Sequence, residues 1–86
     1  MPVKIFFHEK AAKEIKKLDK KSIERIKKEI KKLENNPKTG KHLKYCDFWS
    51  LRIGNYRVIY EVAENKIIVL YLGHRKNVYS DFSKLF

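Results

Sequence analysis

Three strand-like runs in the second half of the chain each place an arginine among apolar and aromatic residues. The runs are Phe48–Ile53, Tyr56–Tyr60 and Lys66–Arg75, and their arginines are Arg52, Arg57 and Arg75. Burying a guanidinium is costly and contributes nothing to an apolar core, so each arginine should lie on an open face of a sheet. The opposite face of every run must then pack against the rest of the molecule.

Alternation along the runs divides their residues between the two faces. Leu51 and Ile53 share one side of the first run, whereas Ser50 and Arg52 share the other. Along the second run and its extension, the side opposite Arg57 carries Tyr56, Val58, Tyr60 and Val62. The three arginines are therefore predicted to share one face, although they come from three strands.

The last run is apolar on both faces from Ile67 to Leu72, which predicts a central strand. The side expected to pack on helices carries Ile68, Leu70, Leu72 and then His74. The side expected to lie with the arginines carries Val69, Tyr71, Gly73 and Arg75. Turns are expected at Gly54-Asn55, where both residues tolerate positive φ, and at Ala63–Asn65.

The first half of the chain predicts one strand and two helices. Pro2–Phe7 is a short apolar run, and from Glu9 the apolar residues recur at helical spacing. Asp19 offers an N-cap for the second helix, or Ser22 does if the turn before it is longer. That helix should end before Pro37, because a proline pushes the preceding residue out of the α region.

These elements predict an α+β fold of order β-α-α-β-β-β with a short C-terminal helical tail. Residues Lys38–Lys44 are expected to form a basic loop, and Asn77–Phe86 the tail. Two antiparallel helices, each with one apolar stripe, would cover one face of a mainly antiparallel sheet. The length of 86 residues leaves room for one core, so residues 1–86 are expected to form a single domain.

The charge balance is the strongest fact of composition. The chain has 21 lysines and arginines against 10 acidic residues, a net charge of +11. This excess favours polyanionic partners, above all nucleic acid, although a lysine-rich surface that only solubilises the protein is the alternative. No run approaches the ~18 apolar residues of a membrane span. The N-terminus shows no signal-peptide pattern and Cys46 is the single cysteine, which predicts a cytoplasmic protein away from membranes.

A cluster of three arginines predicts a phosphodiester site, because an arginine fork binds phosphate oxygens in pairs and stays protonated at any working pH. Tyr79 follows Arg75 by four residues and is close enough in the chain to stack on a base there, to assist proton transfer, or to pack the tail onto the sheet. The alternative for the arginines is that each pairs with a carboxylate such as Glu61 or Asp81, or simply lies in solvent. The three histidines have no metal-ligand spacing, so neither a metal nor another cofactor is expected.

With these residues the chain resembles the RelE toxin family, within the RelE/ParE superfamily of toxin–antitoxin systems. The resemblance spans nearly the whole chain and rests on Ala11–Leu18, Leu51–Glu61 and Gly73–Tyr79, of which the last two are specific. It implies a RelE-like microbial ribonuclease fold and a metal-independent endoribonuclease that cuts mRNA in the ribosomal A site and inhibits translation. It also implies a RelB-like antitoxin partner and a monomeric toxin, with a heterotetrameric complex left open.

The resemblance also implies roles for individual residues. Arg57 matches the family's central phosphate-contacting arginine, Arg75 its second arginine, and Tyr79 its C-terminal tyrosine. Arg52 falls where the family often has a basic strand residue. Ser50 departs from the pattern, because a second basic residue is common there, and this leaves the general base open.

The implied reaction is attack by the ribose 2′-hydroxyl on the adjacent phosphate, which releases a 5′-hydroxyl and a cyclic phosphate. RNA contacts are expected from Lys41, Lys44, Tyr71 and Lys76. The three lysines are also candidates for the base, since neighbouring cations lower a lysine pKa. Tyr71 would either stack on a base or pack under the tail.

Two other functions remain open at this point. A ParE-like toxin would bind DNA gyrase and cut nothing, but such proteins usually lack the full arginine and tyrosine set. A noncatalytic RNA-binding module would use the basic helices and the aromatic side chains.

Overall fold

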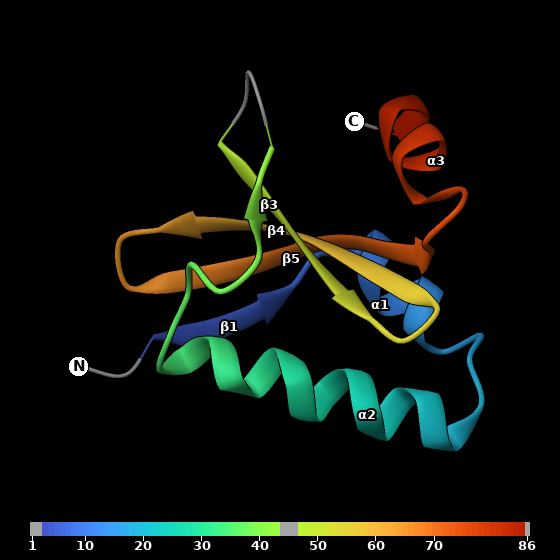
Figure 1. Cartoon of the computed structure of the whole chain (residues 1–86), viewed down its shortest axis with the longest axis horizontal. Coiled ribbons are helices and arrows are strands. Elements are labelled where there is room, and N and C mark those ends of the chain that lie inside the picture. Colours follow the sequence, from blue (N-terminus) through green and yellow to red (C-terminus); the bar gives the residue numbers. More distant parts are fainter. Residues whose placement is uncertain (1–2, 44–46, 86) are drawn as a thin grey trace.

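The computed structural model describes residues 3–43 and 47–85 and shows an α+β fold built on a five-stranded sheet (Figure 1). In chain order the elements are β1 (Lys4–Phe7), α1 (Glu9–Ile15), α2 (Lys20–Lys31), the 3₁₀ turn η1 (Lys32–Glu34), β2 (Lys41–His42), β3 (Phe48–Ile53), β4 (Tyr56–Ala63), β5 (Lys66–His74) and α3 (Val78–Leu85). The predicted order is confirmed, with one strand added. Cys46 lies outside the described residues.

The sheet runs in the order β1-β5-β4-β3-β2, with β1 parallel to β5 and the other neighbours antiparallel. The prediction that β5 is central is confirmed. The prediction that Lys38–Lys44 is a loop throughout was wrong, because Lys41 and His42 pair with β3. Gly40 permits this pairing, since a Cβ there would stand 2.5 Å from the carbonyl oxygen of Ser50.

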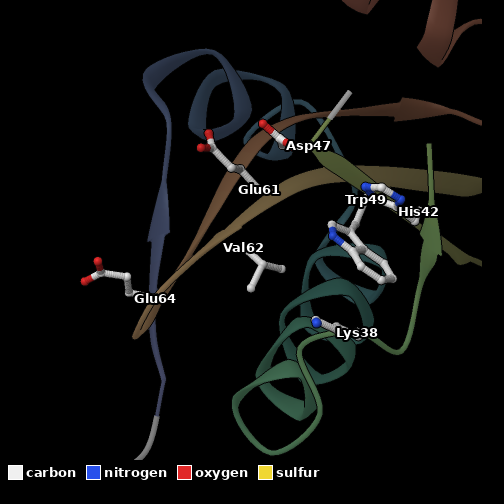
Figure 2. Close-up of a pocket in the computed structure, with 7 residues that line it drawn as sticks. All are labelled: Lys38, His42, Asp47, Trp49, Glu61, Val62 and Glu64. Carbon is white, nitrogen blue, oxygen red and sulfur yellow. The ribbon is translucent and has the colours of Figure 1, made fainter. Parts of the chain in front are cut away.

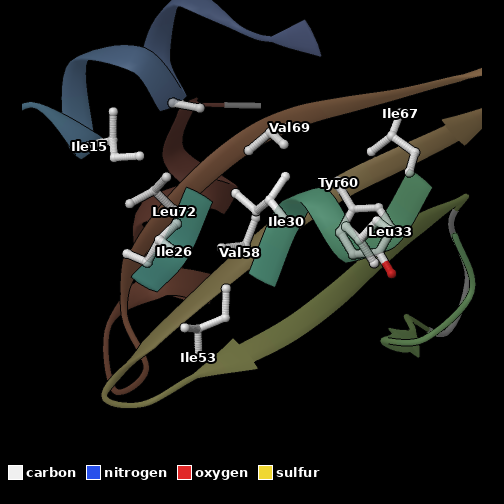
Figure 3. Packing of buried hydrophobic residues seen from close by; sticks show 11 residues of the cluster. Ile15, Ile26, Ile30, Leu33, Ile53, Val58, Tyr60, Ile67, Val69 and Leu72 are labelled. Atoms are coloured by element: carbon white, nitrogen blue, oxygen red, sulfur yellow. The ribbon is translucent and has the colours of Figure 1, made fainter. Parts of the chain in front are cut away.

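Two helices cover one face of the sheet and build the main core, as predicted. Asp19 caps α2, its carboxylate accepting a hydrogen bond from the Ser22 backbone N–H at 3.1 Å. The apolar stripe of α2 then faces the strands (Figure 3). The buried members of this core are Ala11, Ile15, Ile26, Ile30, Leu33, Ile53, Val58, Tyr60, Ile67, Val69 and Leu72.

The predicted faces of β5 were half wrong. Ile67 and Val69 lie in the helix-packed core, where Ile68 and Leu70 were expected. The register shifts between Ile59 and Tyr60, which pair with Tyr71 and Val69 and so leave Leu70 as an extra residue. Such a bulge reverses the alternation on one side of it, and a period of two cannot anticipate that reversal. Beyond the bulge the predicted faces are correct for Tyr71 and Leu72, whereas Arg75 lies past the end of the strand.

The third helix, α3, stands on the side of the sheet away from α2 (Figure 1). Its first residue, Val78, is buried with Ile59 and Tyr71 in a second, smaller core. Phe82 meets Phe48 edge to face at 5.5 Å between ring centroids. The face that carries the arginines is therefore partly roofed by the C-terminal segment. Within the described residues, no helix combines the length and the apolarity that crossing a membrane requires.

Candidate active site

The hairpin of β3 and β4 brings two of the arginines side by side. Arg52 and Arg57 are direct cross-strand partners, so their side chains leave the same face of the sheet. The turn that joins the strands needs Gly54, whose φ is +61°. The Nε of Arg52 donates to the Gly54 carbonyl at 3.1 Å, which draws this side chain toward the turn, whereas Arg57 is half-buried further along the face.

Ser50 connects Arg57 to the C-terminal helix. It is the one buried polar residue of the described chain, with 1% of its surface exposed. The Nη1 of Arg57 donates to its Oγ at 2.7 Å, and the same Oγ lies 2.9 Å from the phenolic oxygen of Tyr79. Residues from β3, β4 and α3 thus meet at one hydroxyl.

Tyr79 presents its ring to solvent while its hydroxyl is anchored. Its exposed fraction is 43%, although Val78 beside it is fully buried. An accessible ring fixed at its oxygen can stack on a nucleic-acid base without further ordering.

Arg75 lies just beyond the end of β5, at the same corner of the sheet. Its backbone N–H donates to the Asn55 carbonyl at 2.9 Å, which fixes it beside the turn that Arg52 and Arg57 flank. Its side chain is exposed, as is that of Lys76, whose backbone N–H donates to Nδ1 of His74 at 3.3 Å. Arg75 therefore joins the cluster from a turn and not from the strand face where alternation placed it.

Strand β2 adds a lysine that the sequence placed in a loop. Lys41 pairs with Ser50, so its exposed side chain leaves the sheet on the face of Arg57. The buried Tyr60 holds this strand in place: its hydroxyl accepts from the Gly40 N–H at 3.2 Å and donates to the Pro37 carbonyl at 3.0 Å. Lys44, the other lysine expected in this region, lies outside the described residues.

Tyr71 packs beneath the tail, which was one of its two expected positions. It is 6% exposed and lies against Val78 in the smaller core, so it cannot stack on a base while α3 is in place. Its hydroxyl lies 3.5 Å from a Glu14 carboxylate oxygen. Burial raises the pKa of Tyr71, and the carboxylates of Glu14 and Asp81 raise that pKa further.

Among the described residues, no carboxylate forms a salt bridge with an arginine of this corner. The salt bridges among the described residues join lysines to glutamates along the helices, as in Lys13–Glu9, Lys17–Glu14 and Lys32–Glu29. A fourth arginine also reaches the corner, since the guanidinium of Arg25 on α2 lies about 3.0 Å from where a Gly54 Cβ would stand. Sequence periodicity gave no sign of Arg25, because only the packing of α2 against the turn brings it there. The site is suited to an anion of more than one charge.

A separate cavity of about 690 Å³ opens at the other end of the sheet (Figure 2). Its lining mixes acidic and aromatic residues: Lys38, His42, Asp47, Trp49, Glu61, Val62 and Glu64. The ring of His42 lies 4.8 Å from that of Trp49. With three carboxylates, this cavity is unsuited to a phosphate. Among the described residues, no group of three histidines, cysteines or acids could hold a metal ion.

In sequence and in fold, the chain is similar to toxins of toxin–antitoxin systems. A family model described as the ParE toxin of type II toxin–antitoxin systems matches residues 5–79. A double arginine-to-alanine mutant of the Escherichia coli toxin RelE, solved in the free state, is 26% identical with a TM-score of 0.83 and covers 100% of this chain and 99% of its own.

Two further solved structures extend the similarity. The RelB–RelE antitoxin–toxin complex from Methanococcus jannaschii gives 31% identity, a TM-score of 0.72, and coverage of 90% of this chain and 98% of that one. The chromosomal ParDE system of Pseudomonas aeruginosa shares the fold, at 15% identity, a TM-score of 0.72, and coverage of 84% and 95%. A search of curated proteins gave no match.

Proposed function

This chain belongs to the ParE toxin family of type II toxin–antitoxin systems, within the RelE/ParE superfamily, and from that premise we propose that it is an mRNA endoribonuclease that acts on the ribosome. Its substrate would be the mRNA in the A site, and its place of action the cytoplasm. Arg57, Arg75, Tyr79 and Arg52 would be its catalytic residues.

The observation that carries the proposal is the joined set of Arg57, Ser50 and Tyr79. A toxin that only binds another protein has no need to fix an arginine and a solvent-facing tyrosine to one buried hydroxyl. A phosphodiester beside a base needs both groups: a fork that holds the phosphate oxygens and a ring that holds the base. Arg52 and Arg75 flank this set. Their positive charges would stabilise the negative charge that develops on the phosphate oxygens in the transition state.

Proton transfer is the weaker part of the site. Of the two candidate bases that the structure describes, Lys41 is better placed than Lys76, because it is the cross-strand neighbour of Ser50. Lys76 lies in the turn after β5, and its proposed role is to bind RNA. An enzyme with modest acid–base groups depends on its partner to align the 2′-oxygen with the phosphorus, and the ribosome would supply that alignment.

We also infer an antitoxin surface at the opposite edge of the sheet. The complexes similar to this chain pair a toxin with RelB. Here the edge strand β1 exposes Phe6 and Phe7, at 50% and 38%. Apolar grooves of about 330 and 230 Å³ meet at Phe7 and Lys27, with Lys16 and Lys31 at their margins. An amphipathic antitoxin segment with acidic residues would fit both the apolar floor and the lysines.

The second candidate function is inhibition of DNA gyrase without cleavage. It is favoured by the family model, whose description is that of a ParE toxin. Gyrase inhibition does not explain why Arg57 and Tyr79 are both held by the Ser50 hydroxyl.

The test uses purified protein and ribosomes loaded with a defined mRNA. Arg57→Ala should lower the single-turnover cleavage rate about 10²–10³-fold, because a donor to the transition-state charge is lost. The matched control is Lys66→Ala, which removes one exposed positive charge at the far end of β5 and should change the rate only slightly. If the two variants lose the same modest factor, or if free RNA is cut as fast as ribosome-bound mRNA, the proposal is wrong.

A further inference from the structure

We propose that Ser50 is a positioning residue whose hydroxyl donates a hydrogen bond to Tyr79, so that the phenolic proton of Tyr79 is left free for the substrate. This inference rests on the proposed function and names the residue that organises its proton transfer. The starting point is the geometry of one buried oxygen, with Arg57 Nη1 at 2.7 Å and Tyr79 at 2.9 Å.

The direction of the bond follows from counting protons. A guanidinium can only donate, so the Ser50 oxygen accepts from Arg57. If Tyr79 also donated to that oxygen, the Ser50 proton would need another acceptor. Among the described residues, Arg57 and Tyr79 are the only side chains bonded to this hydroxyl. A buried hydroxyl proton without an acceptor is costly, so Ser50 donates to Tyr79.

The chain of donors is mutually reinforcing. The Arg57 cation polarises the Ser50 hydroxyl, which makes it a stronger donor to the phenol. The Tyr79 oxygen then accepts, and its own proton is left available to a substrate at a residue that is 43% exposed. A lysine at position 50 would give Arg57 a like charge at close range and could not accept its bond. The family often has a basic residue at this position. With serine there, the site gains a hydrogen bond from Arg57 through Ser50 to Tyr79 that a lysine could not form.

The chemical step balances with Tyr79 as the acid. The 2′-oxygen forms a bond to phosphorus, and the bond from phosphorus to the 5′-oxygen breaks with its electron pair on that oxygen. The Tyr79 proton passes to the 5′-oxygen, which leaves as a hydroxyl. The proton of the 2′-hydroxyl passes to the general base, for which Lys41 is the candidate, and after release of the product Lys41 loses this proton to solvent while the phenolate regains one from solvent.

The experiment compares Ser50→Ala and Ser50→Thr, each with and without Tyr79→Phe, in single-turnover cleavage over a range of ribosome concentrations. Ser50→Ala should lower the maximal rate about tenfold or more at an unchanged half-saturating ribosome concentration. Ser50→Thr keeps the hydroxyl and should restore the rate to within a few-fold. In the Tyr79→Phe background, Ser50→Ala should cost little more, because the two residues act as one unit. An equal cost in both backgrounds would overturn the inference and assign Ser50 to Arg57 alone.

A readout without RNA separates this inference from the proposed function. In protein labelled with ¹³Cζ-tyrosine, the Tyr79 resonance should shift in Ser50→Ala and return in Ser50→Thr. If wild-type protein cuts no mRNA but the resonance behaves in this way, the positioning contact stands and the proposed reaction fails. An unchanged resonance in Ser50→Ala, with thermal melting to confirm that the variant is folded, refutes the contact itself.

Discussion

Replacing Tyr60 by phenylalanine tests how the fold holds β2, the strand that carries Lys41, next to the site. The hydroxyl of this fully buried side chain ties two points of the segment before β2, the Gly40 N–H and the Pro37 carbonyl. Tyr60→Phe removes both bonds and leaves the ring packing unchanged.

The size of the effect follows from those two bonds. Each intramolecular hydrogen bond contributes about 0.5–1.5 kcal/mol net, and water can partly replace it for Pro37 and Gly40, which are only half-buried. We expect a loss of about 1–2 kcal/mol in the free energy of unfolding. For a domain of this size that lowers Tm by roughly 5–15 °C.

The same variant carries a pH signature. Burial raises the pKa of Tyr60 above its ordinary value of 10.0, against a smaller lowering effect of the Gly40 bond. Because the folded pKa is raised, the stabilisation is complete below pH 10 and is lost as the pH rises through the folded pKa. The wild-type protein should therefore lose stability above pH 10, and Tyr60→Phe should lose less.

Thermal melting at pH 7 measures the change in Tm, and urea unfolding at pH 7 and at pH values above 10 measures the change in the free energy of unfolding. Tyr56→Phe is the matched control, because its hydroxyl has no hydrogen-bond partner among the described residues and its removal should change Tm little. A Tm for Tyr60→Phe within about 1 °C of the wild type would show that these bonds do not hold β2, and the placement of Lys41 would lose its support.

Three further predictions follow from single contacts. Gly40→Ala should lower the free energy of unfolding by about 1–3 kcal/mol in urea, since its Cβ would stand 2.5 Å from a backbone oxygen. The control is Gly73→Ala, whose Cβ would have no neighbour nearer than 3.7 Å and which should change this free energy little. The bonds from Ser22 lower the pKa of Asp19, so the stability that this cap provides is present above the ordinary value of 3.8 and is lost as the pH falls through the folded pKa. Asp19→Ala should therefore lower Tm at pH 7, and this effect should shrink as the pH is taken below 3.8. Phe7→Asp should weaken antitoxin binding at least tenfold in calorimetry, since it removes an apolar anchor and repels an acidic segment, while ribosome-dependent cleavage stays near the wild-type rate; unchanged binding would exclude the β1 edge as the antitoxin surface.

The sequence was informative wherever one face of a strand is plainly apolar. The faces of β3 and β4 could be assigned correctly because Leu51, Ile53 and Val58 pack toward the helices and leave Arg52 and Arg57 on the other side. The N-cap at Asp19 and the turn at Gly54 were equally readable, since each depends on a local preference of one residue.

The remainder depended on contacts between distant residues. The strand β2 is two residues long, too short for any periodic signal, and it is set by the approach of Gly40 to β3. The bulge at Leu70 inverted the expected faces of β5 because strands that are apolar on both sides carry no marker of register. Ser50 could be placed on the correct face from sequence, but its contact with Tyr79 spans 29 positions and arises only when α3 folds over the sheet.

The most direct test of the central claim is primer extension on a translated message in cells that express the protein without antitoxin. The account predicts cuts in phase with the codons, and their loss in Arg57→Ala and Arg75→Ala expressed to the same level. Intact messages together with gyrase-linked DNA breaks would contradict it and establish the protein as a gyrase inhibitor.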